Sequence, residues 1–216
     1  KNMKIAVLCG GLSNERNVSI SSGTGIARAL RERGHRVAVV DLFLGYTEPF
    51  ANLEDVFTSE NTVQQFMVAE QAPDLSSLRA LRPDGVMVGP NVLEICRAAD
   101  IAFLALHGEE GENGKLQALL DMYGVRYTGS GYAGALLAMD KDLSKCMIRQ
   151  SGVLVPNGIT LATDELGDLS ACAEKIRRDV GFPCVIKPAS CGSSIGVSMV
   201  DRPEELTAAL EAGGSV

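Results

Sequence analysis

KIAVLCGGLSNE, residues 4–15, decides the fold class of the chain. Its opening run, KIAVLC, is continuously apolar, which is typical of a strand buried on both faces of a parallel sheet. The glycines and polar residues that follow predict a turn, and the apolar spacing over 18–33 predicts a helix that ends at Gly34. RVAVVD at 36–41 predicts a second buried strand. This order makes a βαβ unit, so we expect a parallel sheet with a right-handed crossover.

Further strands extend this predicted sheet. IAFLAL at 101–106 predicts a third buried strand, and VRYTGS at 125–130 predicts a fourth strand with its loop. Strands that alternate with helices along the chain are typical of an α/β fold. Helices are predicted at 61–70, 75–81, 91–98 and 115–123, and over most of 131–150.

A different pattern begins after Ser151-Gly152. VLVPNGITL at 153–161 predicts a strand, and residues 170–180 predict a helix. CVIKPA and VSMV predict strands on either side of the small-residue loop SCGSSIG, and a last helix opens at Pro203. Strands joined by such a tight tip form an antiparallel hairpin, so this part is predicted to be α+β. We expect two domains, at 1–130 and at 131–216, the second of which begins with linker helices.

The composition is that of an ordinary globular protein. The chain has 216 residues, a formal charge of −7 and 46% hydrophobic residues, which argues against intrinsic disorder. The acidic balance disfavours electrostatic capture of nucleic acid or of an anionic membrane. No apolar run reaches the roughly 18–20 residues of a membrane span, and the first residues lack the pattern of a signal peptide. We therefore expect a cytoplasmic protein that binds neither nucleic acid nor membrane.

The cysteines predict neither a zinc site nor a disulfide framework. None of the six forms a Cys-x-x-Cys pair, and most lie in apolar patterns, as Cys9 and Cys184 do. We expect reduced thiols with a structural role. Cys191 differs because it lies in a glycine- and serine-rich loop near Lys187. The chain contains two histidines, and a Cys–His nucleophile is therefore disfavoured.

The loop after the first strand is the first candidate for a ligand site. Glu15 lies at the entrance of the predicted helix, where an acid commonly caps the helix and stabilises it by about 0.3–1 kcal/mol. The carboxyl end of a parallel strand is also where open α/β sheets bind ligands, so both interpretations stay open. The loop lacks the G-x-G-x-x-G spacing of dinucleotide-binding enzymes, which disfavours a dehydrogenase.

HGEEGENG at 107–114 is the second candidate. It directly follows the third predicted strand, so His107 shares the carboxyl edge of the sheet with Glu15. Turn geometry explains the glycines of this loop without any function, but it does not explain a histidine at the end of a strand. A structural and a functional role for His107 are both open.

Two segments that contain lysine are candidates for phosphate binding. Lys141 and Lys145 lie four residues apart on one helix face, a spacing that is also typical of a solvated charged surface. Lys187 leaves a strand and enters a loop of small residues that ends at Gly196. The amides of such a loop form a concavity for anions, its hydroxyls donate, and the lysine neutralises charge. The spacing differs from G-x-x-x-x-G-K-[ST], because the lysine precedes the loop.

Taken together, four ordered motifs resemble the D-alanine–D-alanine ligases of the ATP-grasp superfamily. They are GGLSNERNVS, LHGEEGENGKLQ, YTGSGYAGALLAMDKDLSK and PCVIKPASCGSSIGVS. The resemblance implies an α/β fold with a Rossmann-like pre-ATP-grasp domain at 1–130 and a partial α+β ATP-grasp central domain at 131–216. Such ligases use ATP to activate one D-alanine as an acylphosphate. The amine of a second amino acid then attacks, which gives the dipeptide for peptidoglycan synthesis.

The resemblance also implies roles for the candidate residues. Glu15 matches the acid that holds the ammonium group of the first D-alanine and hydrogen-bonds to Ser193, and these two are the implied catalytic residues. His107 matches the histidine that faces the reacting carboxylate. These roles agree with the residue types, because opposite charges fix a zwitterionic substrate.

The implied ATP site uses the lysine segments. Lys141 and Lys187 match the two lysines that bind the ATP phosphates in the family. Ser194 and the loop amides match the groups that lie over the phosphate that is transferred. Cations at these places stabilise phosphoryl transfer through position and charge.

The sequence departs from the family pattern at several positions. The usual Gly-Glu-Asp-Gly and later Gln-Gly are GENG at 111–114 and Gln117-Ala118 here, and Cys191 stands where an acid is common. The second substrate is therefore open, with D-serine, D-lactate or another carboxylate–amine ligation as alternatives. The family's Mg²⁺ (or Mn²⁺) ligands and adenine contacts belong to a C-terminal domain that would lie beyond Val216. We expect no metal site, no tightly held cofactor and no activity of this chain alone.

The partners implied by the resemblance are D-alanine and ATP. Many such ligases form homodimers, and the first helices are a candidate interface. An alternative from a different class is a non-catalytic module that binds an amino acid or a nucleotide.

Overall fold

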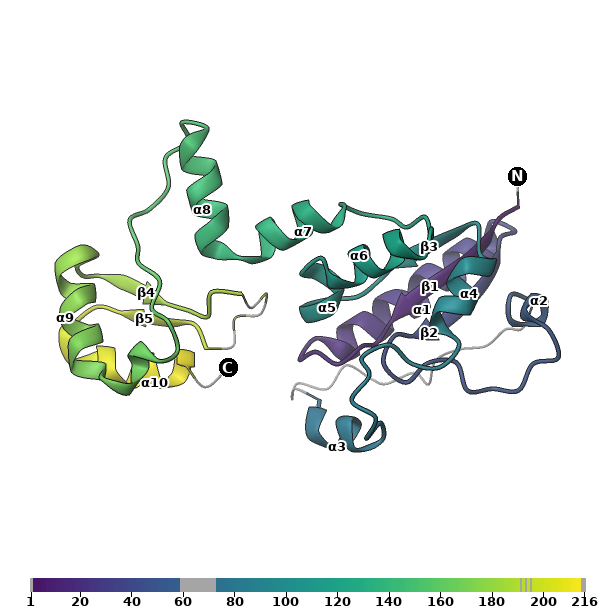
Figure 1. The fold of residues 1–216 in the computed structure, drawn as a ribbon, viewed down its shortest axis with the longest axis horizontal. Helices are drawn as coiled ribbons and strands as arrows, with labels where there is room; N and C mark the ends of the chain where they lie inside the picture. Colours follow the sequence, from purple (N-terminus) through teal and green to yellow (C-terminus); the bar gives the residue numbers. More distant parts are fainter. Residues whose placement is uncertain (1, 59–72, 191, 193, 195, 215–216) are drawn as a thin grey trace. The chain divides into compact units, whose positions relative to one another are not determined.

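The computed structural model describes residues 2–58, 73–190, 192, 194 and 196–214. The chain divides into two compact units, Lys1–Leu136 and Leu137–Val216, and the division falls within helix α7 (Tyr132–Met139). Figure 1 shows the elements of both units, and each unit has a hydrophobic core of its own.

A parallel sheet is the centre of the first unit. Its strand order is β2 (Arg36–Asp41), β1 (Lys4–Cys9), β3 (Ile101–Leu104), so β1 lies between two parallel neighbours. The predicted strands at 4–9 and 36–41 are confirmed, and the third strand ends two residues earlier than its apolar run. Parallel strands of this kind are apolar throughout because helices cover both faces of the sheet.

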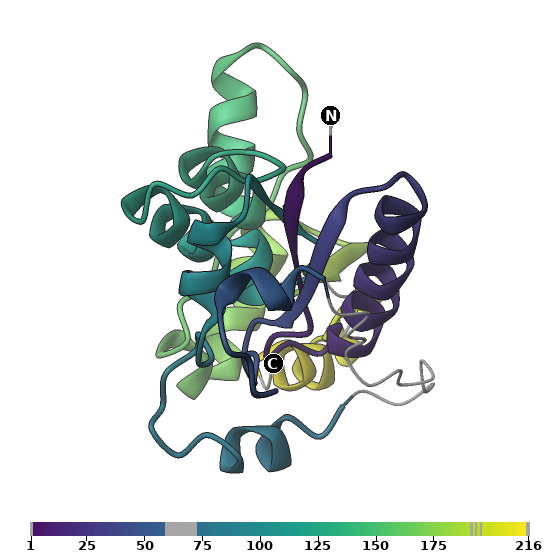
Figure 2. The same ribbon diagram turned by 90° about the vertical axis from the view of Figure 1, so that its right-hand side faces the viewer.

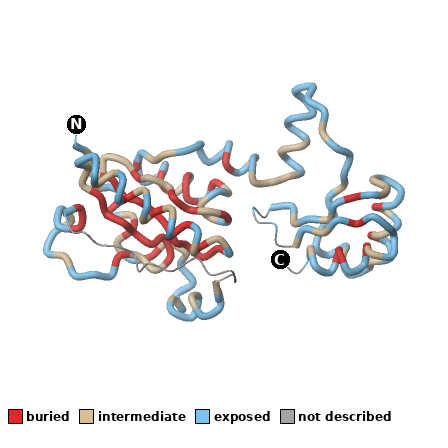
Figure 3. The backbone as a smooth tube through the Cα atoms, turned by 180° about the vertical axis from the view of Figure 1, so that it is seen from behind, coloured by how far each residue is buried: buried red, intermediate tan, exposed pale blue. Residues whose placement is uncertain are grey.

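Helices pack on both faces of this sheet (Figure 2). On one face, α1 (Arg16–Glu32) covers Val7 of β1 and its register partner Val39 of β2. On the other face, α4 (Val92–Ala98) and α6 (Lys115–Met122) pack against the opposite side chains of the same strands. The strands are the most continuously buried part of this unit (Figure 3). The first unit is therefore a three-layer α/β structure, as its sequence pattern predicts.

Helix α1 approaches β1 very closely near the carboxyl end of the strand. A Cβ atom on Gly23 would lie 2.6 Å from Cβ of Cys9, so the helix reaches this position because the residue is glycine. Burial under the helix, together with the nearby Asp41 carboxylate, raises the pKa of the Cys9 thiol to about 12. The close approach holds the start of α1 against the edge of the sheet.

The remaining helices of the first unit are short. The α5 helix forms within HGEEGENG, a segment predicted as a loop, whereas the helices predicted at 75–81, 91–98 and 115–123 are confirmed. The helix predicted at 61–70 lies outside the described residues. None of the helices in the described ranges is long and apolar enough to cross a bilayer. The short helices are α2 (Leu53–Val56), α3 (Leu75–Ala80) and α5 (Glu109–Glu112).

The fourth strand predicted at 125–130 is wrong. Ala102 and Tyr127 form an isolated parallel bridge, and no named strand occupies 125–130, a range that the structure describes in full. The N–H of Leu104 donates to the side-chain hydroxyl of Thr128 at 3.1 Å. Because this hydroxyl takes the place of a main-chain acceptor, the hydrogen bonds between β3 and residues 125–130 do not continue as a strand ladder.

The second unit is an antiparallel hairpin with helices on one face. Strand β4 (Cys184–Ile186) pairs with β5 (Ser198–Val200), and α9 (Leu169–Asp179) and α10 (Leu206–Gly214) pack on the buried side of the pair. This arrangement confirms the predicted hairpin and its α+β class. The unit also contains α8 (Lys141–Gln150), η1 (Glu165–Gly167) and η2 (Pro203–Glu205).

The strand predicted at 153–161 is wrong as well. This segment is described throughout and has no strand partner. Val153 is 55% exposed and Leu154 is 97% exposed, so these apolar side chains do not enter the core of the second unit. An apolar run becomes a strand when a neighbouring strand satisfies its main-chain groups, and no such neighbour is present for 153–161.

Candidate functional site

Glu15 and His107 lie close together at the carboxyl edge of the parallel sheet. Glu15 ends the loop after β1, and His107 follows β3. Between them, Ser13 Oγ accepts a hydrogen bond from the N–H of Glu15 at 3.2 Å and donates one to the carbonyl oxygen of His107 at 2.7 Å. The ends of adjacent parallel strands share one edge, and this is why the structure brings the two candidates together.

The side chain of Glu15 does not cap the helix. Glu15 occupies the N-cap position of α1, but its carboxylate accepts no hydrogen bond from the first turn of that helix. Its Oε2 atom faces Gly108, where an added Cβ would lie 3.0 Å away. Among the described residues, no hydrogen-bond or ion-pair partner of this half-buried carboxylate is found. The interpretation of Glu15 as a side chain that caps the helix by hydrogen bonding is therefore wrong, and its carboxylate instead faces the loop after β3.

His107 is held at its main chain and at its ring. The Oγ atom of Ser22, on α1, lies 3.4 Å from Nε2 of His107, and the direction of this contact depends on the tautomer of the imidazole. Ser13 binds the carbonyl oxygen of the same histidine. The half-buried ring thus lies against α1, and its main chain is held by Ser13.

The glycines of the loop after β3 have structural reasons. The N–H of Gly108 donates to Oε2 of Glu112 at 2.8 Å, and the backbone of Gly108 has φ +69° and ψ 178°. A Cβ on Gly111 would lie 2.4 Å from Cβ of Leu106. Nε2 of Gln117 donates to the carbonyl oxygen of Gly111 at 2.8 Å. Loop geometry therefore accounts for these glycines, as the sequence indicated.

Ser19 and Ser22, two serines of α1 at this site, are absent from the sequence-based candidates. Ser19 Oγ accepts from the N–H of Gly10 at 2.9 Å and donates to the carbonyl oxygen of Ala105 at 2.7 Å, so it joins the loop after β1 to the end of β3. A signal was present in the helical spacing. Arg16 and Ser19 fall on the same buried face of α1 as Ile20 and Ala27. Polar residues on the apolar face of a helix indicate buried hydrogen-bond partners.

In the second unit, Lys141 contacts the loop that begins after Lys187. The main-chain N–H of Lys141 donates to the carbonyl oxygen of Ala189 at 3.1 Å, and its Nζ donates to the same oxygen at 3.3 Å. Ala189 comes two residues after Lys187 at the end of β4. The structure therefore brings the two lysine segments of the sequence analysis together.

Asp140 determines where the helix of Lys141 begins. Its carboxylate accepts hydrogen bonds from the N–H groups of Asp142 and Leu143, each at 2.9 Å, and α8 starts at the next residue. Aspartate is a favoured N-cap because its side chain satisfies N–H groups that lack a partner within the helix. This cap divides the predicted helical stretch 131–150 into α7 and α8 and places Lys141 in the first helical position.

The small-residue loop presents Lys187 and Ser194 on the surface. Both residues are exposed, and the carbonyl oxygen of Ser194 accepts a hydrogen bond from the N–H of Val197 at 3.2 Å. Ser193, predicted to bond to Glu15, and Cys191 lie outside the described residues. A lysine ammonium group and a serine hydroxyl are both groups that can donate hydrogen bonds to an anion.

Family models match most of the chain. Residues 4–130 match the family described as "D-ala D-ala ligase N-terminus", and residues 147–215 match "D-ala D-ala ligase C-terminus".

Several curated relatives carry the name D-alanine--D-alanine ligase. The protein of Lacticaseibacillus casei (strain BL23) is 43% identical over 211 residues, which is 97% of this chain and 57% of the relative. That of Pediococcus pentosaceus is 44% identical over 97% of this chain and 58% of the relative. That of Carboxydothermus hydrogenoformans is 32% identical over 97% of this chain and 53% of the relative. The chain thus spans a little over half the length of these relatives.

Solved structures share the fold of the chain. The D-alanine-D-alanine ligase of Helicobacter pylori has a TM-score of 0.65 and 22% identity, and covers 99% of this chain and 61% of its own. The VanG D-Ala:D-Ser ligase of Enterococcus faecalis has a TM-score of 0.67 and 24% identity, and covers 100% of this chain and 60% of its own. At these identities the comparison shows a shared fold.

Proposed function

The chain belongs to the D-alanine–D-alanine ligase family, and we propose that it forms part of an ATP-dependent ligase that joins two D-alanines for peptidoglycan synthesis. Because the chain spans a little over half the length of the named relatives, the activity is proposed for a ligase of their full length. We place this ligase in the cytoplasm, where ATP is supplied.

In this proposal, the first unit binds the first D-alanine. Glu15 holds the ammonium group of the amino acid, and His107 faces its carboxylate. The observation that carries the proposal is the Glu15 carboxylate, which leaves α1 uncapped and faces the loop of His107. A buried or half-buried carboxylate that binds an ammonium group forms a charge-assisted hydrogen bond, which is about twice as strong as a neutral one.

The second unit binds the phosphates of ATP in this proposal. Lys141 and Lys187 contact the phosphates, and Ser194 with the loop amides covers the phosphate that is transferred. Support comes from the contact of Lys141 with Ala189, which joins the two lysine segments. Positive charge at these positions would stabilise the charge that develops on the phosphate oxygens. Ser193, which lies outside the described residues, is proposed as the hydrogen-bond partner of Glu15 and as a catalytic residue with it.

We propose that the full-length ligase uses Mg²⁺ (or Mn²⁺) together with ATP. No group of three or more His, Cys, Asp or Glu side chains suited to a metal ion occurs among the described residues. The roles proposed here for Glu15, His107 and the lysines are binding, orientation and neutralisation of charge.

Binding of D-alanine tests the role of Glu15. We expect the 216-residue chain to bind D-alanine in calorimetry, and Glu15→Gln to weaken the affinity about tenfold or more, because it removes the charge that faces the ammonium group. Glu109→Gln is the matched control, since Glu109 is exposed and lies in the same pair of loops. Equal affinity for D-alanine in the wild-type chain and in Glu15→Gln would contradict this role.

Turnover tests the reaction and the acceptor. Phosphate release with ATP, Mg²⁺ and D-alanine is measured for the 216-residue chain, and for the same chain joined to the rest of the Lacticaseibacillus casei relative. We expect turnover in the joined chain alone, with D-alanine preferred over D-serine and D-lactate as acceptor. Faster turnover with D-serine or D-lactate would assign a different acceptor. Tight binding of D-alanine with no turnover in the joined chain would favour a non-catalytic binding module.

A further inference from the structure

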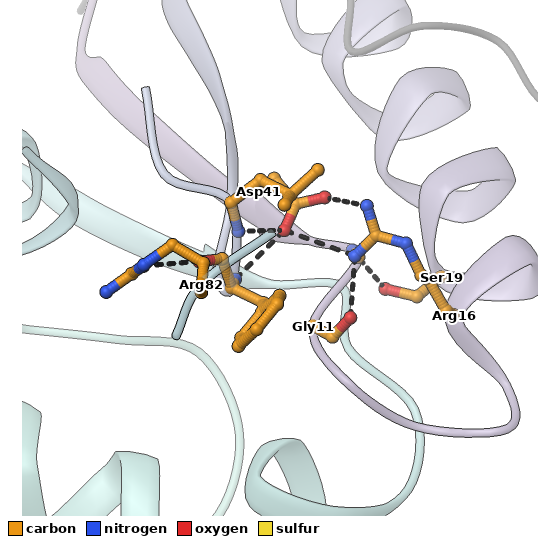
Figure 4. A network of polar contacts seen from close by, with 8 residues as sticks. Gly11, Arg16, Ser19, Asp41 and Arg82 are labelled. Atoms are coloured by element: carbon orange, nitrogen blue, oxygen red, sulfur yellow. Dashed lines mark hydrogen bonds and ion pairs between the residues drawn. The ribbon is translucent and has the colours of Figure 1, made fainter. Parts of the chain in front are cut away.

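A buried ion pair lies directly beneath the loop that carries Glu15 (Figure 4). Arg16, the first residue of α1, makes two contacts with the carboxylate of Asp41 at the end of β2: Nη1 donates to Oδ1 at 3.2 Å, and Nη2 donates to Oδ2. The two side chains are 3% and 4% exposed. Taking such a charged pair out of water costs desolvation energy, so the pair by itself is weak evidence of a gain in stability.

The hydrogen bonds of this pair reach three segments of the first unit. Arg16 Nη1 also donates to the carbonyl oxygen of Gly11 at 2.6 Å. Asp41 Oδ1 also accepts from the N–H groups of Phe43 and Leu44, each at 2.9 Å. The pair therefore ties the loop after β1 to the start of α1 and to the turn after β2.

The loop backbone rests on the pair at Gly10. This residue has φ +72°, and a Cβ placed on it would lie 2.3 Å from Oδ2 of Asp41 and 2.9 Å from Nη1 of Arg16. A side chain at position 10 would collide with both partners. The conformation of Gly10-Gly11 and the ion pair consequently depend on each other.

The ion pair is next to the residue that binds substrate in the proposed function. Arg16 follows Glu15 directly, and the side chains of the two residues leave the chain in different directions: Arg16 into the interior, Glu15 toward Gly108. Arg16 holds Gly11 and His107 holds Ser13, so the loop that leads to Glu15 is fixed at two points.

We propose that Arg16 and Asp41 are positioning residues, which hold the loop from Gly10 to Glu15 so that the Glu15 carboxylate meets the ammonium group of a D-amino acid. This inference rests on the proposed function for its ligand. Whether the ion pair holds this loop in place can be tested without any ligand.

The test is a double variant that removes the charges and keeps the volume. In Arg16→Met with Asp41→Asn, the asparagine Oδ1 can still accept from the N–H groups of Phe43 and Leu44, but the link to Gly11 is lost. Replacing both partners of a buried pair together avoids an unpaired charge in the interior, so the fold is expected to persist. Arg36→Met with Glu54→Gln is the matched control, because it removes the ion pairs that Glu54 makes with Arg36 and Lys4 at the opposite end of β2.

Amide hydrogen exchange measures directly how firmly the loop is held. We expect the N–H groups of Gly10 and Glu15 to exchange about tenfold faster or more in the double variant, with those of Phe43 and Leu44 unchanged and with no such effect in the control. Unchanged exchange at Gly10 and Glu15 would overturn the proposal. If the double variant fails to fold, the same measurement is made on Arg16→Lys, which keeps the charge but lacks the planar fork that reaches Asp41 and Gly11 together.

D-alanine affinity then separates the two proposals. We expect the affinity of the double variant for D-alanine to fall about tenfold or more, as in Glu15→Gln, whereas the control binds like the wild-type chain. Wild-type affinity in the double variant, together with weak binding by Glu15→Gln, would overturn the positioning role alone. A wild-type chain that does not bind D-alanine would instead remove the proposed function, and exchange at Gly10 and Glu15 would still decide the role of the ion pair.

Discussion

Ser13 Oγ donates a 2.7 Å hydrogen bond to the carbonyl oxygen of His107, a residue 94 positions further along the chain. Ser13 is 4% exposed, and the same oxygen accepts the N–H of Glu15. One buried hydroxyl therefore joins the loop after β1 to the loop after β3. The two residues proposed to bind the amino acid are thus parts of one hydrogen-bonded unit.

Replacing Ser13 by alanine should lower the free energy of unfolding by about 1–3 kcal/mol, because the N–H of Glu15 and the carbonyl oxygen of His107 lose their partner in a buried place. Urea unfolding measures the change. Ser21→Ala on the exposed side of α1 is the control and should stay within about 0.5 kcal/mol of wild type. A Ser13→Ala variant no less stable than Ser21→Ala would contradict this prediction.

Gly108→Ala should disturb both the backbone and the Glu15 side chain. The combination φ +69° and ψ 178° is one that residues with a Cβ rarely adopt, at a cost of about 1–3 kcal/mol, and the new Cβ would lie 3.0 Å from Oε2 of Glu15. We expect lower stability together with weaker D-alanine binding. Gly124→Ala provides the comparison, since Gly124 also has a positive φ, of +66°, but has nothing within 4 Å of an added Cβ. It should lose stability and keep its affinity for D-alanine, and equal affinities in the two variants would refute the contact with Glu15.

Asp140→Ala should loosen the first turn of α8. Loss of an N-cap side chain costs about 0.5–2 kcal/mol, and the N–H groups of Asp142 and Leu143 lose their acceptor. Hydrogen exchange at these two amides measures the effect, and we expect faster exchange. Asp140→Asn keeps an acceptor oxygen and should stay close to wild type. The cap assignment fails if exchange in Asp140→Ala matches that in Asp140→Asn.

The stability of the chain should fall at alkaline pH. Burial raises the pKa of the Cys9 and Cys96 thiols from 9.0 to about 12, so the folded chain keeps protons that the unfolded chain releases. The stabilising effect is complete below pH 9 and is lost as the pH rises toward 12, with a slope of about 1.4 kcal/mol per pH unit for each thiol.

Urea unfolding between pH 8 and pH 11 checks this alkaline slope. Cys96→Ala should reduce the slope of the free energy of unfolding against pH by the contribution of one thiol. Cys146→Ala should leave this slope unchanged because Cys146 is exposed. Identical slopes in the wild-type chain and in Cys96→Ala would rule out the buried thiol as a cause.

Local pattern was sufficient for much of the fold. The apolar runs at 4–9 and 36–41 and the helical spacing of α1 and α6 lead to the observed elements, because burial follows the period of each element. The same reasoning was wrong at 125–130 and at 153–161. In the first case the side chain of Thr128 replaces a main-chain acceptor, and in the second the run has no neighbouring strand.

The sequence by itself indicated the candidate site residues and the family of the chain, because motifs such as SNERNVS and CGSSIG are local and can be read directly. Only the tertiary structure decided that Glu15 is not a helix cap, that Ser13 binds His107, and that Arg16 pairs with Asp41. The partners in these two contacts are 94 and 25 residues apart. Such contacts depend on the order of the parallel strands and on the close packing of α1, and neither is contained in the spacing of residues along the chain.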